Sequence, residues 1–199
     1  MGRPKQPDIS EHLLDRCTDH ALEHGLPDRL QPFVDATGTS ARMLLYHFGT
    51  RDELLRAVLR RARQRHLEYF AALFSVVPGE SYASTLARAW VAMTGPRAQP
   101  FLRMFGQLTE QHDTSLWPGF RAKATTDWLQ PLEAGLATID RAESATLVLA
   151  VIRGLILDLD ATADVDRADE AFGVLLKSLD PSAPPISRGE RTVSRPASA

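Results

Sequence analysis

The residues with the clearest chemical potential lie in one short segment, 38–55. Arg42 carries a guanidinium that can bind the O6 and N7 atoms of guanine, and Tyr46 and His47 can donate to phosphates or contact base edges. Ser40 stands where it can cap a helix, so that neighbouring backbone N–H groups can face a phosphate. These residue types at this spacing predict nucleic-acid recognition.

Helices on both sides must position that segment. Apolar residues at four-residue spacing predict a first helix over 9–24, and Asp28 with Gln31 three residues later forms a capping signal for a second. After the glycine turn 37–39, Ser40 caps a third helix. Thr50 caps a fourth helix, whose exposed face is expected to carry Arg56, Arg60, Arg61, Arg63 and Arg65. Two short helices joined by a tight turn are typical of a helix-turn-helix, which places its second helix in the major groove.

The segment resembles the signature of the TetR family of transcriptional regulators, roughly G-V-S-x-x-T-L-Y-x-H-F, then a break, a basic residue, an acidic residue and leucines. Matching positions are Gly38, Ser40, Leu44, His47, Phe48, Arg51, Glu53, Leu54 and Leu55. Met43 replaces the threonine. Leu45 occupies the family's aromatic position, and Tyr46 follows it. The resemblance implies a homodimer that binds double-stranded operator DNA and a small-molecule effector.

The expected fold is all-α, with an N-terminal three-helix helix-turn-helix domain over 1–50. A helical ligand-binding and dimerisation bundle follows over 51–180, and a disordered tail over 181–199. Further helices are predicted over 82–93, from 101, and over 120–137, 142–159 and 165–179. The segment 142–159 is apolar nearly all round, which requires cover on more than one side. It fits the dimerising role that the family gives to its last two helices.

Two sets of site residues follow. Within the DNA-binding set, Arg3 and Lys5 lie on an arm that could enter a minor groove, and Arg51 suits a phosphate. Leu44, Leu45 and Phe48 are expected in the core instead. The DNA-binding set is Arg3, Lys5, Arg29, Gln31, Ser40, Ala41, Arg42, Met43, Tyr46, His47 and Arg51. The ligand-binding set, for which plain core packing is the competing interpretation, is Trp90, Met93, Phe101, Met104, Phe105, Leu108, His112, Trp117, Phe120, Trp128 and Arg153.

The composition and the charge distribution limit the classes of function that the protein can have. The formal net charge is −2, but residues 1–65 have a balance of +2 and the remainder one of −4, which fits a DNA-reading end joined to a different body. The single cysteine, Cys17, excludes an intrachain disulfide and lies in an apolar stripe, so a buried thiol is expected. No signal peptide or bilayer-length apolar run is present, which predicts a cytoplasmic protein with no membrane partner.

The predicted function is a ligand-responsive repressor released from its operator by a small, mainly apolar molecule, with no cofactor, no metal and no enzymatic activity. Two alternatives stay open. One is a helical architectural DNA-binding protein without a ligand. The other is a helical-bundle enzyme, which in its carboxylate-bridged form would need inward-facing Glu-x-x-His pairs that the sequence lacks.

Overall fold

The computed structural model describes residues 7–110 and 116–188, and the fold of these residues is all-α, as predicted. They contain no strand. None of the helices in these ranges is both long enough and apolar enough to cross a lipid bilayer. The helices are α1 Pro7–His24, α2 Gln31–Thr37, α3 Ala41–Phe48, α4 Arg51–Ala71, α5 Tyr82–Met93, α6 Gln99–Glu110, α7 Phe120–Ala137, α8 Ala145–Thr162 and α9 Val165–Leu179, with short 3-10 turns η1 Ala72–Phe74 and η2 Ala142–Ser144.

The chain forms two compact units. Unit 1 comprises Met1–Ala72 and Pro96–Trp128, and unit 2 comprises Leu73–Gly95 and Leu129–Ala199. The first half of α7 therefore belongs to unit 1 and the second half to unit 2. Unit 1 takes in the predicted segment 1–50 together with α4 and α6. The domain boundaries proposed from the sequence stay a prediction.

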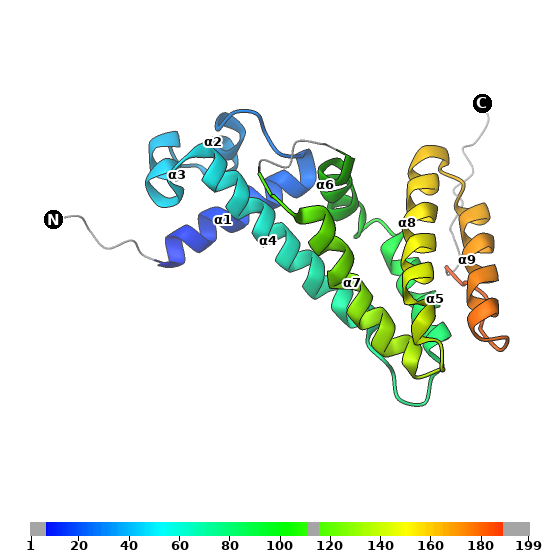
Figure 1. The fold of residues 1–199 in the computed structure, drawn as a ribbon. Coiled ribbons are helices and arrows are strands. Elements are labelled where there is room, and N and C mark those ends of the chain that lie inside the picture. Colours follow the sequence, from blue (N-terminus) through cyan, green and yellow to red (C-terminus); the bar gives the residue numbers. More distant parts are fainter. Residues whose placement is uncertain (1–6, 111–115, 189–199) are drawn as a thin grey trace, which may run out of the picture. The chain divides into compact units, whose positions relative to one another are not determined.

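In unit 1, α1 packs against α2, α3, α4 and α6, and the short helices α2 and α3 lie at the N-terminal end of α4 (Figure 1). One apolar core runs through these helices, from Phe33 and Leu44 in the helix-turn-helix to Phe105 and Phe120 in α6 and α7. Cys17 lies in this core, and burial raises the pKa of its thiol to about 12. The thiol is therefore a packing group, as predicted.

Local signals explain where the helices of unit 1 begin and end. Gly38 closes α2 with a left-handed φ of 69°, a conformation that glycine adopts at little cost. The Ser40 hydroxyl accepts a hydrogen bond from the Met43 backbone N–H and caps α3. Thr50 and Glu53 form a reciprocal capping box that starts α4.

Two local predictions are wrong. The second helix does not start at Asp28; it starts at Gln31, and its N-cap residue Leu30 makes no side-chain cap. Pro32 lies in the first turn, where no intrahelical N–H bond is lost. The arginines of α4 do not form one exposed face, because Arg63 is buried. Arg61 and Arg65 are half-buried and bind acidic residues of α1, namely Glu11, Asp15 and Asp19.

Unit 2 is held together by α5 and α9 packing against each other and by α8 lying alongside α9 (Figure 1). Trp90 of α5 stacks on Phe172 of α9 with ring centroids 4.6 Å apart, and both side chains are fully buried. The Trp90 indole Nε1–H donates to Asp169 at 2.8 Å, and Arg188 binds the same carboxylate. Residues 181–188 of the predicted tail are thus part of the described structure, and the rest of that tail lies outside it.

The Tyr82 ring lies so close to α7 that position 135 has no room for a side chain. A Cβ at this position would lie 1.9 Å from the Tyr82 ring. The Tyr82 hydroxyl lies 3.3 Å from the Phe74 carbonyl oxygen and 3.4 Å from that of Pro131, so the buried ring has little freedom to move.

Gly135→Ala is therefore expected to lower the free energy of unfolding by about 1–3 kcal/mol, the usual cost of overpacking. Gly173→Ala is the matched control, because a Cβ there meets no atom within 4 Å. The control should be neutral, or stabilising by up to about 1 kcal/mol through helix propensity. Urea unfolding of both variants measures the difference, and equal midpoints would contradict the steric argument.

Candidate functional site

The exposed face of α3 carries the side chains best suited to read DNA. Arg42, Met43 and Tyr46 are exposed, Tyr46 by 49%, while Leu44 between them is fully buried and anchors the helix to the core. Leu45 was predicted to pack inside, but it is exposed and lies on the outer side of the helix. Leu44 is the one fully buried residue of α3, because this helix of eight residues turns only one face towards α1, α2 and α4.

The remaining candidates surround α3. Ala41 and Ser40 are exposed at its N-terminus, and Arg29 and Gln31 are exposed at the start of α2. Besides the Ser40 hydroxyl that caps α3, the side chains of Gln31, His47 and Arg51 make bonds within the protein. Gln31 Nε2 donates to Asp35 at 2.7 Å, and His47 Nδ1 shares a hydrogen bond with Ser10 at 2.8 Å.

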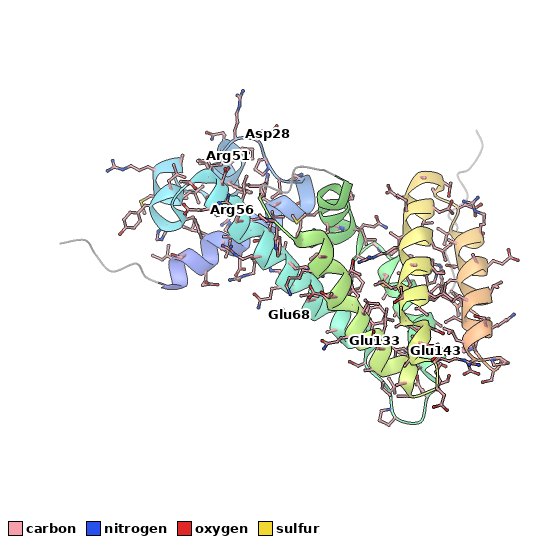
Figure 2. All side chains as sticks on the ribbon, viewed as in Figure 1. Asp28, Arg51, Arg56, Glu68, Glu133 and Glu143 are labelled. Atoms are coloured by element: carbon pink, nitrogen blue, oxygen red, sulfur yellow. The ribbon has the colours of Figure 1, made fainter. Side chains whose placement is uncertain are left out.

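Arg51 is the third such side chain. Its Nη2 donates to the Pro27 carbonyl oxygen at 3.1 Å, and its Nη1 lies 3.2 Å from an Asp52 carboxylate oxygen. Figure 2 shows Arg51 beside the loop that carries Asp28. The guanidinium therefore ties the start of α4 to the loop before α2.

Four predicted residues cannot be placed in full. Arg3, Lys5 and His112 lie outside the described residues, and the side chain of Leu108 in α6 lies outside the described part as well. The predictions for these residues remain untested.

Unit 1 also contains a dense aromatic cluster formed by α4, α6 and α7. The imidazole of His66 stacks on Phe101 and on Phe105, with centroids 5.2 Å from each, and meets Trp128 edge-on. Phe70 packs edge-on against the same imidazole, with centroids 4.7 Å apart. We call this group, with Tyr69 and Phe120, the aromatic cluster. It contains four of the predicted ligand-binding residues: Phe101, Phe105, Phe120 and Trp128.

A buried ion pair borders the cluster. The Arg63 guanidinium lies over the rings of Trp128, Phe105 and Phe120, 5.2–5.8 Å from their centroids. It also donates to Asp127 at 2.9 Å. Burial alone would raise the pKa of Asp127, but hydrogen bonds from Arg63 and Lys123 outweigh burial and lower it. Asp127 is therefore a carboxylate at neutral pH.

The α4 residues of this cluster are not among the ligand-binding residues predicted from the sequence. The signal was present, because Leu59, Ala62, His66 and Phe70 recur every three or four residues and mark one buried face of α4. The arginines at 56, 60, 61, 63 and 65 concealed that face, because Arg63 at its edge has the same residue type as its exposed neighbours.

The other predicted ligand residues divide between the two units. Met104 and Trp117 accompany the aromatic cluster in the core of unit 1. Trp90 and Met93 are buried in unit 2, where Trp90 is fully engaged by Phe172 and Asp169. Arg153 is exposed on α8. The predicted set is thus not one continuous group within either unit.

The pKa of His66 gives unit 1 a pH-dependent stability. Burial, reinforced by the neighbouring Arg63 charge, lowers this pKa to about 3 from 6.5. Below pH 6.5, His66 binds a proton in the unfolded chain but not in the folded chain. The free energy of unfolding therefore decreases as the pH falls from 6.5 towards 3.

Between pH 7 and pH 5, this single group is expected to remove about 2 kcal/mol of stability. His66→Phe keeps a ring in place but abolishes the titration. Urea unfolding of the two proteins at both pH values measures the effect as the difference between their pH dependences. Parallel pH profiles would show that His66 titrates normally in the folded chain.

An apolar surface remains on α8 and α9. Leu147 and Leu157 of α8 and Val174 of α9 are each more than half exposed. Gly154 lies between the two leucines, and a Cβ there would meet no atom within 4 Å. We call these four residues the α8–α9 face. Exposed large apolar side chains at helical spacing, next to a small residue, are typical of helix–helix interfaces.

Comparisons with known proteins agree with this architecture. No protein-family model and no curated protein matches the sequence. The multidrug binding protein EbrR, solved with imidazole, is 21% identical with a TM-score of 0.63, over 90% of this chain and 93% of that one. A transcriptional regulator from Rhodococcus sp. Rha1 is 22% identical with a TM-score of 0.65, over 85% of this chain and 95% of that one. A TetR-like transcriptional regulator from Rhodococcus sp. RHA1 is 20% identical with a TM-score of 0.57, over 89% and 96%.

The chain therefore has the fold of the TetR-like transcriptional regulators, with a helix-turn-helix followed by further helices. At the level of the fold, this confirms the resemblance that residues 38–55 indicated.

Proposed function

We propose that this chain is a cytoplasmic, TetR-type transcriptional repressor that binds operator DNA as a homodimer and is released by a small, mainly apolar molecule. The observation that carries the proposal is the α3 face. Arg42 and Tyr46 stand exposed on a capped helix of a helix-turn-helix, where the second helix of this motif enters the major groove. The fold likeness supports the same function.

Within this proposal, the contacts to DNA are shared among the predicted residues. Arg42 reads a base, because its guanidinium can bind guanine through two hydrogen bonds. Ser40, Ala41 and the first backbone N–H groups of α3 face a phosphate. Tyr46 contacts the DNA backbone or a base edge. Arg51 orients α4 against the loop before α2 and so supports the motif indirectly.

The response to a ligand is supported by the aromatic cluster and by its position on α4. The start of α4 packs against the helix-turn-helix through Leu54 and Leu55, and its later turns carry Arg63 and His66. A single apolar core joins Phe33 and Leu44 to Phe105 and Phe120, so a ligand that displaces the cluster rings would also displace α4. EbrR, which shares the fold, was solved with ethidium and with proflavin.

Dimerisation through α8 and α9 is supported by the α8–α9 face. Its exposed leucines and valine would lose contact with water against a second copy, and each fully buried side chain of this kind contributes about 1.5–3 kcal/mol. Operator sites of helix-turn-helix dimers consist of two half-sites, about 34–36 Å apart, that match the symmetry of the protein.

Arg42→Ala tests the base-reading role. Loss of a bidentate contact to guanine is expected to weaken binding to an operator selected from random DNA by about 1–3 kcal/mol and to relax the preference at one base position. Wild-type binding should also fall steeply with salt, because basic contacts release counterions. Fluorescence anisotropy with labelled duplexes measures both effects.

Arg88→Ala is the control for this test, because Arg88 lies in unit 2, far from α3 in sequence, and pairs with Glu80. It should leave operator affinity unchanged. If no duplex selected from a random pool binds more tightly than bulk DNA, the proposed function is wrong. Unchanged binding by Arg42→Ala alone would remove only Arg42 from the reading surface.

A further inference from the structure

One polar atom of the aromatic cluster makes no hydrogen bond to any residue that the structure describes. Arg63 Nη1 lies 2.9 Å from His66 Nδ1, and because a guanidinium can only donate, Nδ1 is the acceptor. A neutral imidazole that accepts at Nδ1 carries its proton on Nε2. Within the described part of the chain, His66 Nε2 makes no hydrogen bond, although the residue is only 8% exposed.

Aromatic rings surround the His66 imidazole on several sides. Phe101 and Phe105 stack on the imidazole, and Trp128 and Phe70 meet it edge-on. Phe70 and Phe105 are buried, whereas Phe101 and Trp128 are only half-buried. Phe101 and Trp128 are therefore the two of these rings that remain partly open to solvent.

The charges at the cluster decide which molecule fits. Arg63 already lies on the faces of Trp128, Phe105 and Phe120, which is where a cationic ligand would gain its attraction to aromatic rings. Asp127, which pairs with Arg63, already binds Lys123 as well. A second guanidinium, that of Arg97, lies 5.2 Å from the Tyr69 ring centroid. These contacts bring three cations and one carboxylate to the cluster, so a further cation is disfavoured.

We propose that the effector of this chain is an aromatic molecule with a carboxylate or another strong hydrogen-bond acceptor, bound among Phe101, Phe105 and Trp128 with its acceptor on His66 Nε2–H. Because the Arg63 guanidinium already occupies the ring faces that a cationic ligand would contact, planar cations should bind weakly. This inference rests on the proposed function, since it names the chemical class of the effector. The low pKa of His66 fits this role, because the neutral imidazole keeps its donor and its tautomer at physiological pH.

The test compares three probes of one shape on the full chain: 2-naphthoate, 2-methylnaphthalene and 2-naphthylmethylammonium. Titration calorimetry measures each dissociation constant for the wild-type protein and for His66→Phe, which keeps the ring but removes the donor. We expect 2-naphthoate to bind most tightly. The substitution should weaken its binding at least about tenfold, the effect of losing a hydrogen bond to a charged group. Binding of 2-methylnaphthalene should change little.

A second readout covers the case in which His66→Phe does not fold. In the wild-type protein, 2-naphthoate should shift the nitrogen and proton resonances of His66 Nε2–H and leave the imidazole neutral. The proposal is overturned if 2-naphthoate does not bind, if the cationic probe binds more tightly, or if the His66 resonances do not respond. None of these results affects operator binding by the wild-type protein, so a failed inference can be distinguished from a failed function.

Discussion

Phe172→Asp is expected to unfold unit 2. The Phe172 ring is fully buried and stacks on Trp90, with centroids 4.6 Å apart. Truncating such a ring costs about 3–5 kcal/mol through lost packing. A carboxylate in its place adds the cost of burying a charge without a partner, beside the carboxylate of Asp169. The total is comparable with the whole stability of an ordinary domain.

Circular dichroism and urea unfolding measure this result. The control is Lys177→Asp, a change to the same residue five positions along α9, where the side chain is exposed and lies outside the α8–α9 face. The two positions on one helix should thus differ by several kcal/mol, because only Phe172 packs against α5. A Phe172→Asp protein with the helical content and unfolding midpoint of the wild type would contradict the described core of unit 2.

Leu157→Glu is expected to dissociate the dimer while the chain stays folded. Leu157 is 62% exposed in the single chain, so the glutamate is harmless there. In the proposed dimer, the same carboxylate would be buried against the partner copy. That cost of several kcal/mol should raise the dimer dissociation constant by at least about 100-fold. Operator affinity should fall with it, because one monomer holds only one half-site.

Analytical ultracentrifugation at several concentrations checks this prediction, with DNA binding measured in parallel. Val76→Glu is the matched control, because Val76 is 46% exposed and lies between α4 and α5, outside the α8–α9 face. The control should remain dimeric. If the Leu157→Glu protein sediments as the wild-type protein does, Leu157 lies outside the dimer interface.

Much of the fold is accessible to sequence analysis because its signals are local. Ser40 and Thr50 predict the starts of α3 and α4, and Gly38 predicts the turn before α3. These signals can be found in the sequence because caps and turns depend on residues within a few positions of one another. Periodic apolar residues predict α5, α7 and α9 with the bounds that the structure has. The start of α2 fails, because the Asp28–Gln31 signal is also compatible with a loop.

Other features depend on contacts between distant residues. Leu45 and Leu44 have the same chemical character, but only the packing of α3 on α1 and α4 decides which of them is buried. Arg63 is similarly indistinguishable in sequence from Arg60, which is exposed. Its burial depends on Asp127, 64 residues away, which supplies the countercharge that a buried guanidinium requires.

The sequence by itself determined that the chain is all-α, that it begins with a helix-turn-helix and that Arg42 and Tyr46 stand on its second helix, because capping, turn formation and helical periodicity are local. Only the tertiary structure decided that His66 and Arg63 meet the rings of α6 and α7, and that Trp90 closes the core of unit 2. The physical reason is that burial, ring stacking and the neutralisation of a buried charge depend on residues that meet only in the folded chain. In these sites, the residues that meet are separated by 35–82 positions along the chain.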